Sequence, residues 1–365
     1  MAKKIALLGT GGTIAGTAPS AEDKVGYTAA QISIQNLLRG VPGALALPFV
    51  VEAEQVAQID SKDMGFAVWT DLATRVAHHL TQDDVAGVVI THGTDTLEET
   101  AFFLHLALPH LLWPRSLLAN KPVVLTCAMR PATSKEADGP QNLGDALLLA
   151  AYLGAQGVIV VCAGQIHAAL HVQKIHTERL NAFDSGDAGV LGSISAGVVK
   201  MASAAASSTS DATDASLASF GGSPVRVMSE LYGLESRQPE SSQSIWHLPA
   251  PSDWPRVEIV MNYAGASGHT VDAWVAEALT ANRSNASPIP PVRGIVVAGT
   301  GNGTVHDDLQ AALVRAQTAG IRVVRTTRCA YGQVQAVPGQ GLAEISALTP
   351  VKARVALILA LMTSK

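Results

Sequence analysis

Two glycine-containing loops carry the hydroxyl groups that could do chemistry in this sequence. The first lies in Lys3–Ala18, where the apolar run 4–8 leads into a glycine-rich loop with Thr10 and Thr13. A threonine hydroxyl can attack a carbonyl carbon when a neighbouring group accepts its proton. The same loop could instead bind a phosphate, or simply connect two elements. From this stretch alone, these interpretations stay open.

The second loop, Thr91–Thr96, follows the apolar run 85–90 and contains Thr94 and Asp95. Each loop places a threonine four or five residues beyond the end of an apolar run. If the two runs are neighbouring parallel strands, their loops meet in one crevice, because parallel strands end at the same edge of a sheet. Two hydroxyls, a carboxylate and backbone N–H groups in a small volume suit acyl transfer.

Alternating strand and helix patterns must position these loops. A helix is predicted at 64–80 from its i, i+4 apolar stripe, and another at 143–153. Strands alternating with helices indicate βαβ units and a parallel sheet. We therefore expect an α/β fold with a larger N-terminal, doubly wound, mostly parallel sheet domain and a smaller C-terminal α/β domain. The strands predicted in the larger domain are 4–8, 49–59, 85–90, 123–128 and 157–161.

A change in composition separates the two predicted domains. Met201–Gly222 is dominated by Ser, Ala, Thr and Gly and has no apolar period. We expect a catalytic α/β domain over 1–198, a Ser/Ala/Pro-rich linker or insertion over 199–255, and a C-terminal α/β domain over 256–365.

Composition also excludes several functions. The chain has 365 residues, 48% of them hydrophobic, and a net charge of −5, which argues against nucleic acid as a partner. No run reaches the ~20 apolar residues of a membrane span, so we expect no membrane partner. The spacing of Cys127, Cys162 and Cys329 favours buried free thiols over a metal site or a disulfide framework. The N-terminus lacks the features of a signal peptide, so a cytoplasmic location is expected, or a periplasmic one if a signal has been removed.

The two loops together carry a family resemblance. The segments GTGGTIAG and HGTDTLEET resemble the two signatures of the bacterial-type L-asparaginases, which hydrolyse asparagine to aspartate and ammonia. A third segment, Ala128–Leu143, is similar to another part of that family. The resemblance keeps its order and spacing over nearly the whole chain, through further matches at 60–61, 299–303 and 350–354.

The resemblance implies roles for five residues. Thr13 matches the nucleophilic threonine, and Tyr27 matches the tyrosine that lies over it and helps to activate it. Thr94 matches a second active-site threonine, which works with Lys174 and Asp95. A lysine whose pKa is lowered by desolvation could take a proton through Thr94. The segment around Lys174 matches loosely, and a solvated surface lysine is the alternative interpretation.

The resemblance also implies the substrate contacts. Asp95 would bind the α-ammonium group of L-asparagine and Ser61 its α-carboxylate, with Asp60, Thr94 and Gly12 completing the pocket. A zwitterionic substrate needs one anion and one set of donors at a fixed separation. The family implies neither a metal nor another cofactor, and it implies a homotetramer or homodimer.

One part of the sequence departs from the family. In tetrameric members a neighbouring subunit contributes an Asn or Ser and a Glu to the amino end of the substrate. Thr304 stands at the first of these positions, and Arg328–Gly341 contains no acidic residue, only Gln333 and Gln335. The preference between asparagine and glutamine is therefore open.

Three alternative functions remain beside asparagine hydrolysis: a glutaminase-asparaginase of mixed specificity, the ammonia-generating subunit of a tRNA-dependent amidotransferase, and a non-catalytic amino-acid-binding regulator. An amidotransferase subunit would be expected to carry a basic RNA-binding or partner-binding module, which this chain lacks. Retention of Thr13, Thr94 and Asp95 argues against a regulator.

Overall fold

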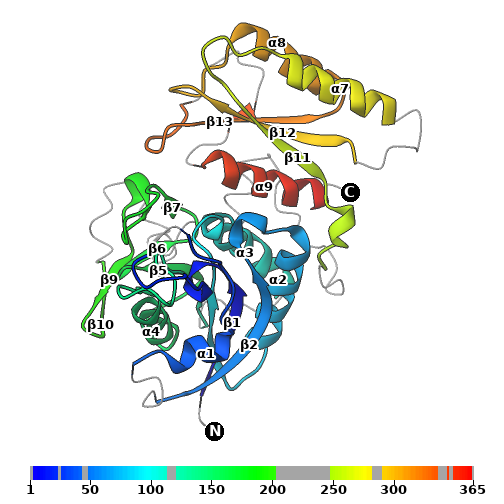
Figure 1. Cartoon of the computed structure of the whole chain (residues 1–365). Coiled ribbons are helices and arrows are strands. Elements are labelled where there is room, and N and C mark those ends of the chain that lie inside the picture. Colours follow the sequence, from blue (N-terminus) through cyan, green and yellow to red (C-terminus); the bar gives the residue numbers. More distant parts are fainter. Residues whose placement is uncertain are drawn as a thin grey trace. The chain divides into compact units, whose positions relative to one another are not determined.

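The structure is a computed structural model that describes residues 3–23, 26–42, 48–112, 121–202, 247–281, 290–335, 343–344 and 348–363. The described residues fall into two compact units (Figure 1). The N-terminal unit extends to residue 202 and includes residues 247–248, and the C-terminal unit begins at Pro249. The segment 199–255, predicted as a linker, lies mostly outside the described residues.

Five parallel strands form the centre of the N-terminal sheet, in the order β5-β4-β3-β1-β2. Because β2 and β3 flank β1 on opposite sides, the strand order reverses at β1. Open α/β sheets bind ligands at such a reversal, beyond the carboxyl ends of the strands. The strands are β1 (Lys4–Gly11), β2 (Val50–Ile59), β3 (Val85–Thr91), β4 (Val123–Thr126) and β5 (Val158–Cys162).

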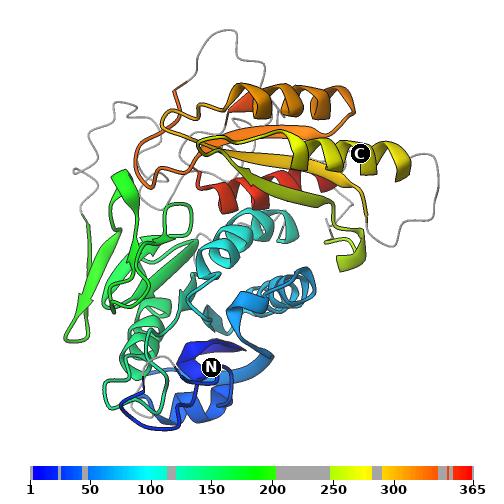
Figure 2. The same ribbon diagram turned by 45° about the horizontal axis from the view of Figure 1, so that its top comes forward.

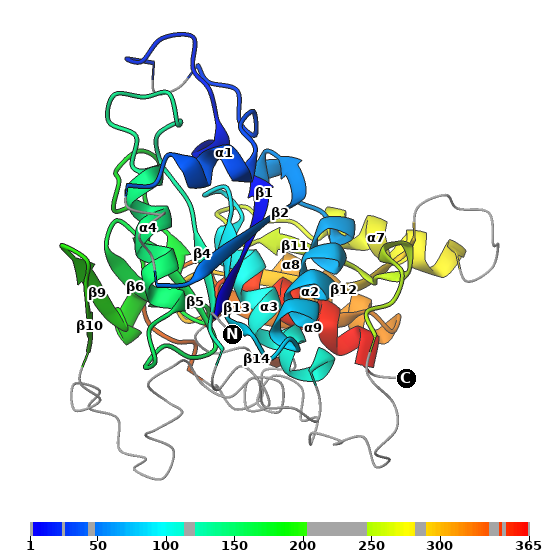
Figure 3. The same cartoon turned by 90° about the horizontal axis from the view of Figure 1, so that it is seen from below.

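Helices cover both faces of this sheet (Figure 3). On one face, α1 (Ile34–Arg39) and α4 (Gly139–Ala150) pack against the central strands and against each other. On the other face lie α2 (Phe66–Leu80) and α3 (Leu97–Leu111). The apolar side chains of β1, β3 and β4, except that of Ala86, are buried between these layers. Burial on both faces explains why these strands read as continuous apolar runs.

An antiparallel extension was not predicted from the sequence. It adds β6 (Gln165–Ala168), β9 (Gly192–Ser195) and β10 (Val198–Met201) beyond β5, giving eight strands in all. A separate two-stranded sheet pairs β7 (Gln173–Lys174) with β8 (Phe183–Asp184).

The C-terminal unit is a smaller, fully parallel sheet in the order β11-β12-β13-β14. Its helices α7 (His269–Ala281) and α8 (Asp307–Thr318) pack on one face, and α9 (Pro350–Thr363), red in Figure 2, packs on the other. The strands are β11 (Arg256–Met261), β12 (Val292–Gly299), β13 (Arg322–Thr327) and β14 (Ala343–Glu344). The predicted fold class, including the smaller C-terminal α/β domain, is confirmed.

The helix predicted at 143–153 was displaced. It begins four residues earlier, at Gly139, and ends at Ala150. Pro140 does not interrupt it, because proline is tolerated in the first turn of a helix, where its missing N–H needs no partner. The helix predicted at 64–80 begins at Phe66, after Gly65.

Candidate active site

Three loops meet where β2, β1 and β3 end. The turn after β1 contains Gly12, with a φ of 80°, and a Cβ atom there would collide with the backbone of Gly93 in the loop after β3. A Cβ atom on Gly93 would in turn collide with the side chain of Ser61, which follows β2. The two threonine loops and the serine therefore form one cluster, as the strand order requires.

Gly12 reaches this position through its backbone contacts. Its N–H donates to the carbonyl of Ile59 at 2.8 Å, and its carbonyl accepts from the N–H groups of Ala15 and Ala30. Both polar groups of Gly12 are thus engaged within the protein.

Thr13 begins a single 3-10 turn, η1 (Thr13–Ala15), and only 7% of it is exposed. Its hydroxyl forms a hydrogen bond with the hydroxyl of Tyr27, with the oxygens 2.7 Å apart. The segment carrying Tyr27 is held against the loop by an antiparallel bridge between Thr17 and Thr28. The neighbouring Thr10 donates its hydroxyl hydrogen to the carbonyl of Thr91 at 2.9 Å and is buried, so it ties β1 to β3.

Thr94, Asp95 and Lys174 form a second hydrogen-bonded group. Lys174 Nζ donates to Thr94 Oγ1 and to Asp95 Oδ1, at 2.7 Å in both cases. The lysine side chain is 20% exposed, so the alternative of a solvated surface lysine is wrong. Both contacts of Asp95 with this group involve Oδ1, since Thr94 also approaches that oxygen at 3.4 Å.

Ser61 lies in the turn η3 (Ser61–Asp63) and is buried. Its Oγ accepts the N–H of Asp95 at 3.3 Å, and its carbonyl accepts the hydroxyl of Thr96 at 2.8 Å. Because an accepting hydroxyl keeps its own hydrogen, Ser61 can still donate to an anion.

Asp60 accepts the N–H of Lys62 and so caps the turn that holds Ser61. Lys62 Nζ pairs with Asp63 at 2.5 Å and lies mostly in solvent. Asp60 thus shapes the Ser61 turn, and the Lys62 ammonium lies between the Asp60 carboxylate, at 3.6 Å, and that of Asp63.

His92, which lies between Thr91 and Thr94 in the loop after β3, is fully buried. Its Nδ1–H donates to the carbonyl of Gly93 at 2.8 Å, which fixes the loop beside Thr94. Burial lowers the pKa of His92 to about 4, so the imidazole is neutral at pH 7. His92 therefore orders the loop as an uncharged donor.

Sequence reasoning assigned no task to two carboxylates in this region. Glu98 Oε2 accepts the backbone N–H of Lys174 at 2.7 Å. Asp138 accepts the N–H groups of Met129 and Arg130, both at 2.9 Å, and so folds the third family segment back on itself. Position near the start of a helix was the available signal for both, since acidic residues favour that place.

The C-terminal residues at the departing positions form their own contacts. Thr304 Oγ1 lies 2.9 Å from Thr300 Oγ1, within a small turn closed by two backbone hydrogen bonds. Asn302, in the same turn, accepts the N–H of Gln335, while Gln333 and Gln335 are exposed. Nothing in these described residues supplies the acid that other family members carry there.

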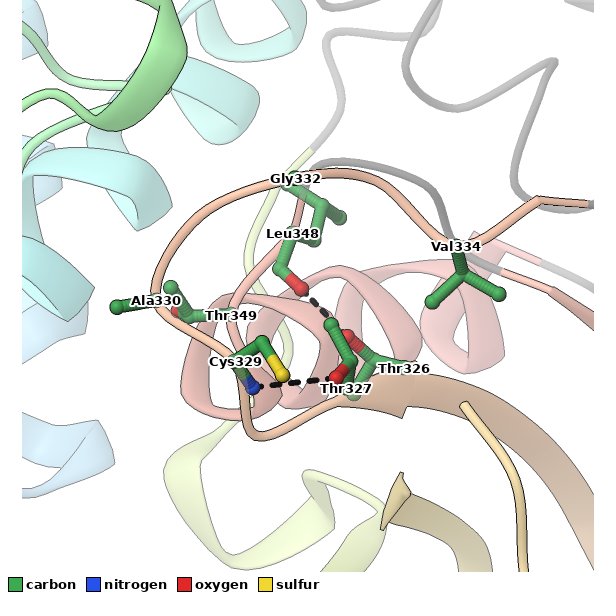
Figure 4. Close-up of a pocket in the computed structure, with 8 residues that line it drawn as sticks. All are labelled: Thr326, Thr327, Cys329, Ala330, Gly332, Val334, Leu348 and Thr349. Atoms are coloured by element: carbon green, nitrogen blue, oxygen red, sulfur yellow. Dashed lines mark hydrogen bonds between the residues drawn. The ribbon is translucent and has the colours of Figure 1, made fainter. Parts of the chain in front are cut away.

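A pocket beyond the carboxyl end of β13 lies in the same unit (Figure 4). The polar groups in its wall are bonded to one another: Thr327 Oγ1 accepts the N–H of Cys329, and Thr326 donates to the carbonyl of Leu348. The paired threonines of the N-terminal unit therefore remain the better candidate site.

Across the described ranges, no three His, Cys, Asp or Glu residues are grouped so that they could hold a metal ion. Among the helices of the described part, none has the length and apolarity to cross a membrane.

Two protein-family models match this chain. The family model described as "Asparaginase, N-terminal" matches residues 4–207, and "Glutaminase/Asparaginase C-terminal domain" matches residues 256–365. Together they cover most of the chain, which therefore belongs to the asparaginase family of amidohydrolases. The predicted family and the predicted class of enzyme are confirmed.

Individual relatives match over nearly the whole chain. L-asparaginase 2 of Escherichia coli (strain K12) is 34% identical, over 99% of this chain and 89% of the relative. A protein named glutaminase-asparaginase from Pseudomonas fluorescens biotype A is 31% identical, over 90% of this chain and 76% of the relative. A solved structure titled as a probable cytoplasmic L-asparaginase from Campylobacter jejuni has 35% identity and a TM-score of 0.77, covering 99% of this chain and 96% of its own.

Proposed function

We propose that this protein hydrolyses L-asparagine to L-aspartate and ammonia, with Thr13 as the nucleophile. The observation that carries the proposal is the pair of hydroxyls on adjoining loops, each hydrogen-bonded to a group able to exchange a proton. Thr13 contacts Tyr27, and Thr94 contacts Lys174. Membership of the asparaginase family supports the reaction class.

In the proposed first half-reaction, Thr13 Oγ attacks the side-chain amide carbon and gives up its proton. The hydrogen bond to Tyr27 offers a route for that proton. The C–N bond then breaks, the nitrogen takes a proton, and ammonia leaves an aspartyl ester on Thr13. Each proton transfer of this kind contributes about 10²–10⁴-fold to a rate.

In the second half-reaction, water attacks the ester carbon and the bond to Thr13 Oγ breaks. Aspartate leaves and the Thr13 hydroxyl is restored. Lys174 and Thr94 are proposed to relay the proton from that water, since Nζ lies 2.7 Å from Oγ1.

The proposed substrate contacts follow from groups that keep bonding capacity. Ser61 retains its hydroxyl hydrogen for the α-carboxylate. Asp95 uses Oδ1 for Lys174, and its Oδ2 is proposed to accept the α-ammonium group. Asp60 supports the Ser61 turn, and Gly12, whose Cα packs against Gly93 and so brings the two loops together, is proposed to line the substrate pocket.

The test compares ammonia release from asparagine by the parent enzyme and by Thr13→Ala and Thr94→Ala variants. We expect a loss of at least about 10³-fold for Thr13→Ala, as for removal of a covalent nucleophile. Circular dichroism must match the parent for each variant. Parent rates in both folded variants would refute the proposed roles.

Mixed asparagine and glutamine specificity is the second candidate function. It is favoured by the absence of an acidic residue from Arg328–Gly341 and by relatives named glutaminase-asparaginase. Side-by-side kcat/KM values for the two amides decide between the candidates, with a ratio below about 10 supporting mixed specificity.

We propose that the enzyme works as a homodimer or homotetramer, as the resemblance implies, and that it is located in the cytoplasm. Relatives differ in location, because one solved structure is titled cytoplasmic and another relative is named periplasmic. Light scattering on the purified protein tests the assembly, and fractionation of the native cell tests the location.

A further inference from the structure

One short segment of the chain forms hydrogen bonds with both the side chain and the backbone of Lys174. Its side-chain Nζ is bonded to Thr94 and Asp95, as described above, and its backbone N–H donates to Glu98 Oε2 at 2.7 Å. Thr94, Asp95 and Glu98 belong to five consecutive residues that end in the first turn of α3. The start of α3 and the loop just before it therefore hold both the side chain and the backbone of Lys174.

The element that carries Lys174 needs such support. β7 has only two residues, and its partner strand β8 also has two. An isolated two-stranded ribbon is marginally stable in water. A lysine side chain has about 2 kcal/mol of rotamer entropy, so its amine is well placed only when its backbone is fixed.

Glu98 has the properties of an anchor. Only 8% of it is exposed, and burial of a carboxylate is costly unless hydrogen bonds compensate. The first turn of α3 offsets part of that cost through the helix dipole. Hydrogen bonds to a carboxylate are roughly twice as strong as those between neutral groups.

We propose that Glu98 is a positioning residue that fixes Lys174 against Thr94. The proposal rests on the function proposed above for the Thr94–Lys174 pair. Glu98 acts through the lysine backbone, so its loss changes kcat more than KM.

A matched pair of substitutions at Glu98 separates the effect of its hydrogen bond to Lys174 from the effect of its negative charge. Glu98→Gln removes the charge and keeps an acceptor at the same reach, whereas Glu98→Asp keeps the charge and is one methylene shorter. We expect Glu98→Asp to lower kcat about 10- to 100-fold, the loss of one charge-assisted hydrogen bond. Glu98→Gln should stay within about 5-fold of the parent, with KM changed less than about 3-fold in both. Glu99→Gln changes the same helical turn and serves as the control.

Hydrogen exchange followed by mass spectrometry tests the hydrogen bond between the Lys174 amide and Glu98 directly. The amide of Lys174 should exchange at least about 10-fold faster in Glu98→Asp than in the parent or in Glu98→Gln. Unchanged exchange in both variants, or a larger kcat loss in Glu98→Gln than in Glu98→Asp, would overturn the inference.

If the proposed proton relay through Lys174 is wrong, the results differ from those expected if only the role of Glu98 is wrong. If Lys174→Met releases ammonia at the parent rate, the proposed relay is wrong, even where exchange shows that Glu98 holds the lysine backbone. If Lys174→Met is inactive and Glu98→Asp keeps the parent kcat and exchange, only the role of Glu98 is wrong.

Discussion

Gly12 and Gly93 lie backbone against backbone, with no room for a side chain on either residue. This contact joins the loop of Thr13 to the loop of Thr94, although 81 residues separate the glycines. The close approach explains the glycines of both loops in physical terms. It also makes their replacement the most direct test of the loop arrangement.

Gly12→Ala should destabilise the protein by about 2–4 kcal/mol, because the new methyl group meets backbone and the φ of 80° is unfavourable for alanine. Gly157→Ala is the control. Gly157 has a similar φ of 69° but open space around its Cβ position, so only the backbone cost of about 1–2 kcal/mol remains. Urea unfolding measures both. Equal losses would mean that the two loops do not touch as described.

Tyr27→Phe should lower kcat about 10- to 100-fold and leave the fold intact. The change removes only the hydroxyl that bonds Thr13, and such a proton-transfer contact contributes about 10²–10⁴-fold at most. Steady-state ammonia release checks this expectation. Adding Thr13→Ala to Tyr27→Phe should cost no more than Thr13→Ala alone, because residues that act as a unit are not additive. Independent losses would contradict a shared proton route.

His92 should make stability depend on pH in a defined window. Its pKa is about 4 in the folded protein and 6.5 when unfolded, so between these values only the unfolded chain binds the proton. The free energy of unfolding therefore falls as the pH drops from 6.5 to 4, by about 3 kcal/mol in total. Below pH 4 this residue contributes no further loss.

His92→Asn tests the window, because its amide can still donate to the Gly93 carbonyl and does not titrate. Between pH 7 and pH 4.5, the parent should lose about 2–3 kcal/mol more stability than the variant. Parallel pH profiles for the two proteins would show that His92 is not buried as described.

One of the three cysteines should react quickly in the native protein. Cys329 is exposed, while Cys127 and Cys162 are buried with their sulfur atoms 3.6 Å apart. The hydrogen bond with Cys162, together with burial, raises the pKa of the Cys127 thiol and disfavours the reactive thiolate. A thiol reagent should therefore label one group per native chain and all three after denaturation. Cys329→Ser should abolish the fast phase. Rapid labelling of all three would mean that the ends of β4 and β5 are open.

The sequence predicted those parts of the fold that local pattern determines. The central strands are buried on both faces, so each appears as an apolar run, and the prediction of parallel β1 and β3 is confirmed. The Gly192–Ser195 and Val198–Met201 strands were missed. They have four residues each; the first alternates between buried and exposed positions and the second between exposed and partly buried ones, too short a pattern to distinguish from a loop.

Within the candidate site, the loop residues were predictable and the supporting residues were not. Thr13 and Thr94 follow strands directly, so the strand pattern places them. Lys174 lies on a two-residue strand, and its contacts come from 76 to 80 residues away. Glu98 looks like an ordinary first-turn acid in the sequence. Only tertiary packing distinguishes it from Glu99.

The spacing of the site residues has a consequence for synthesis in the cell. Thr13, Thr94 and Lys174 are separated by about 80 residues each, and translation adds about 5–20 residues per second. The three groups therefore leave the ribosome at intervals of about 4–16 s. A nascent chain that has already exposed both threonine loops still lacks the lysine and the β7–β8 ribbon. On the role proposed above for Lys174, ammonia release therefore cannot begin before the lysine and its ribbon have been synthesised.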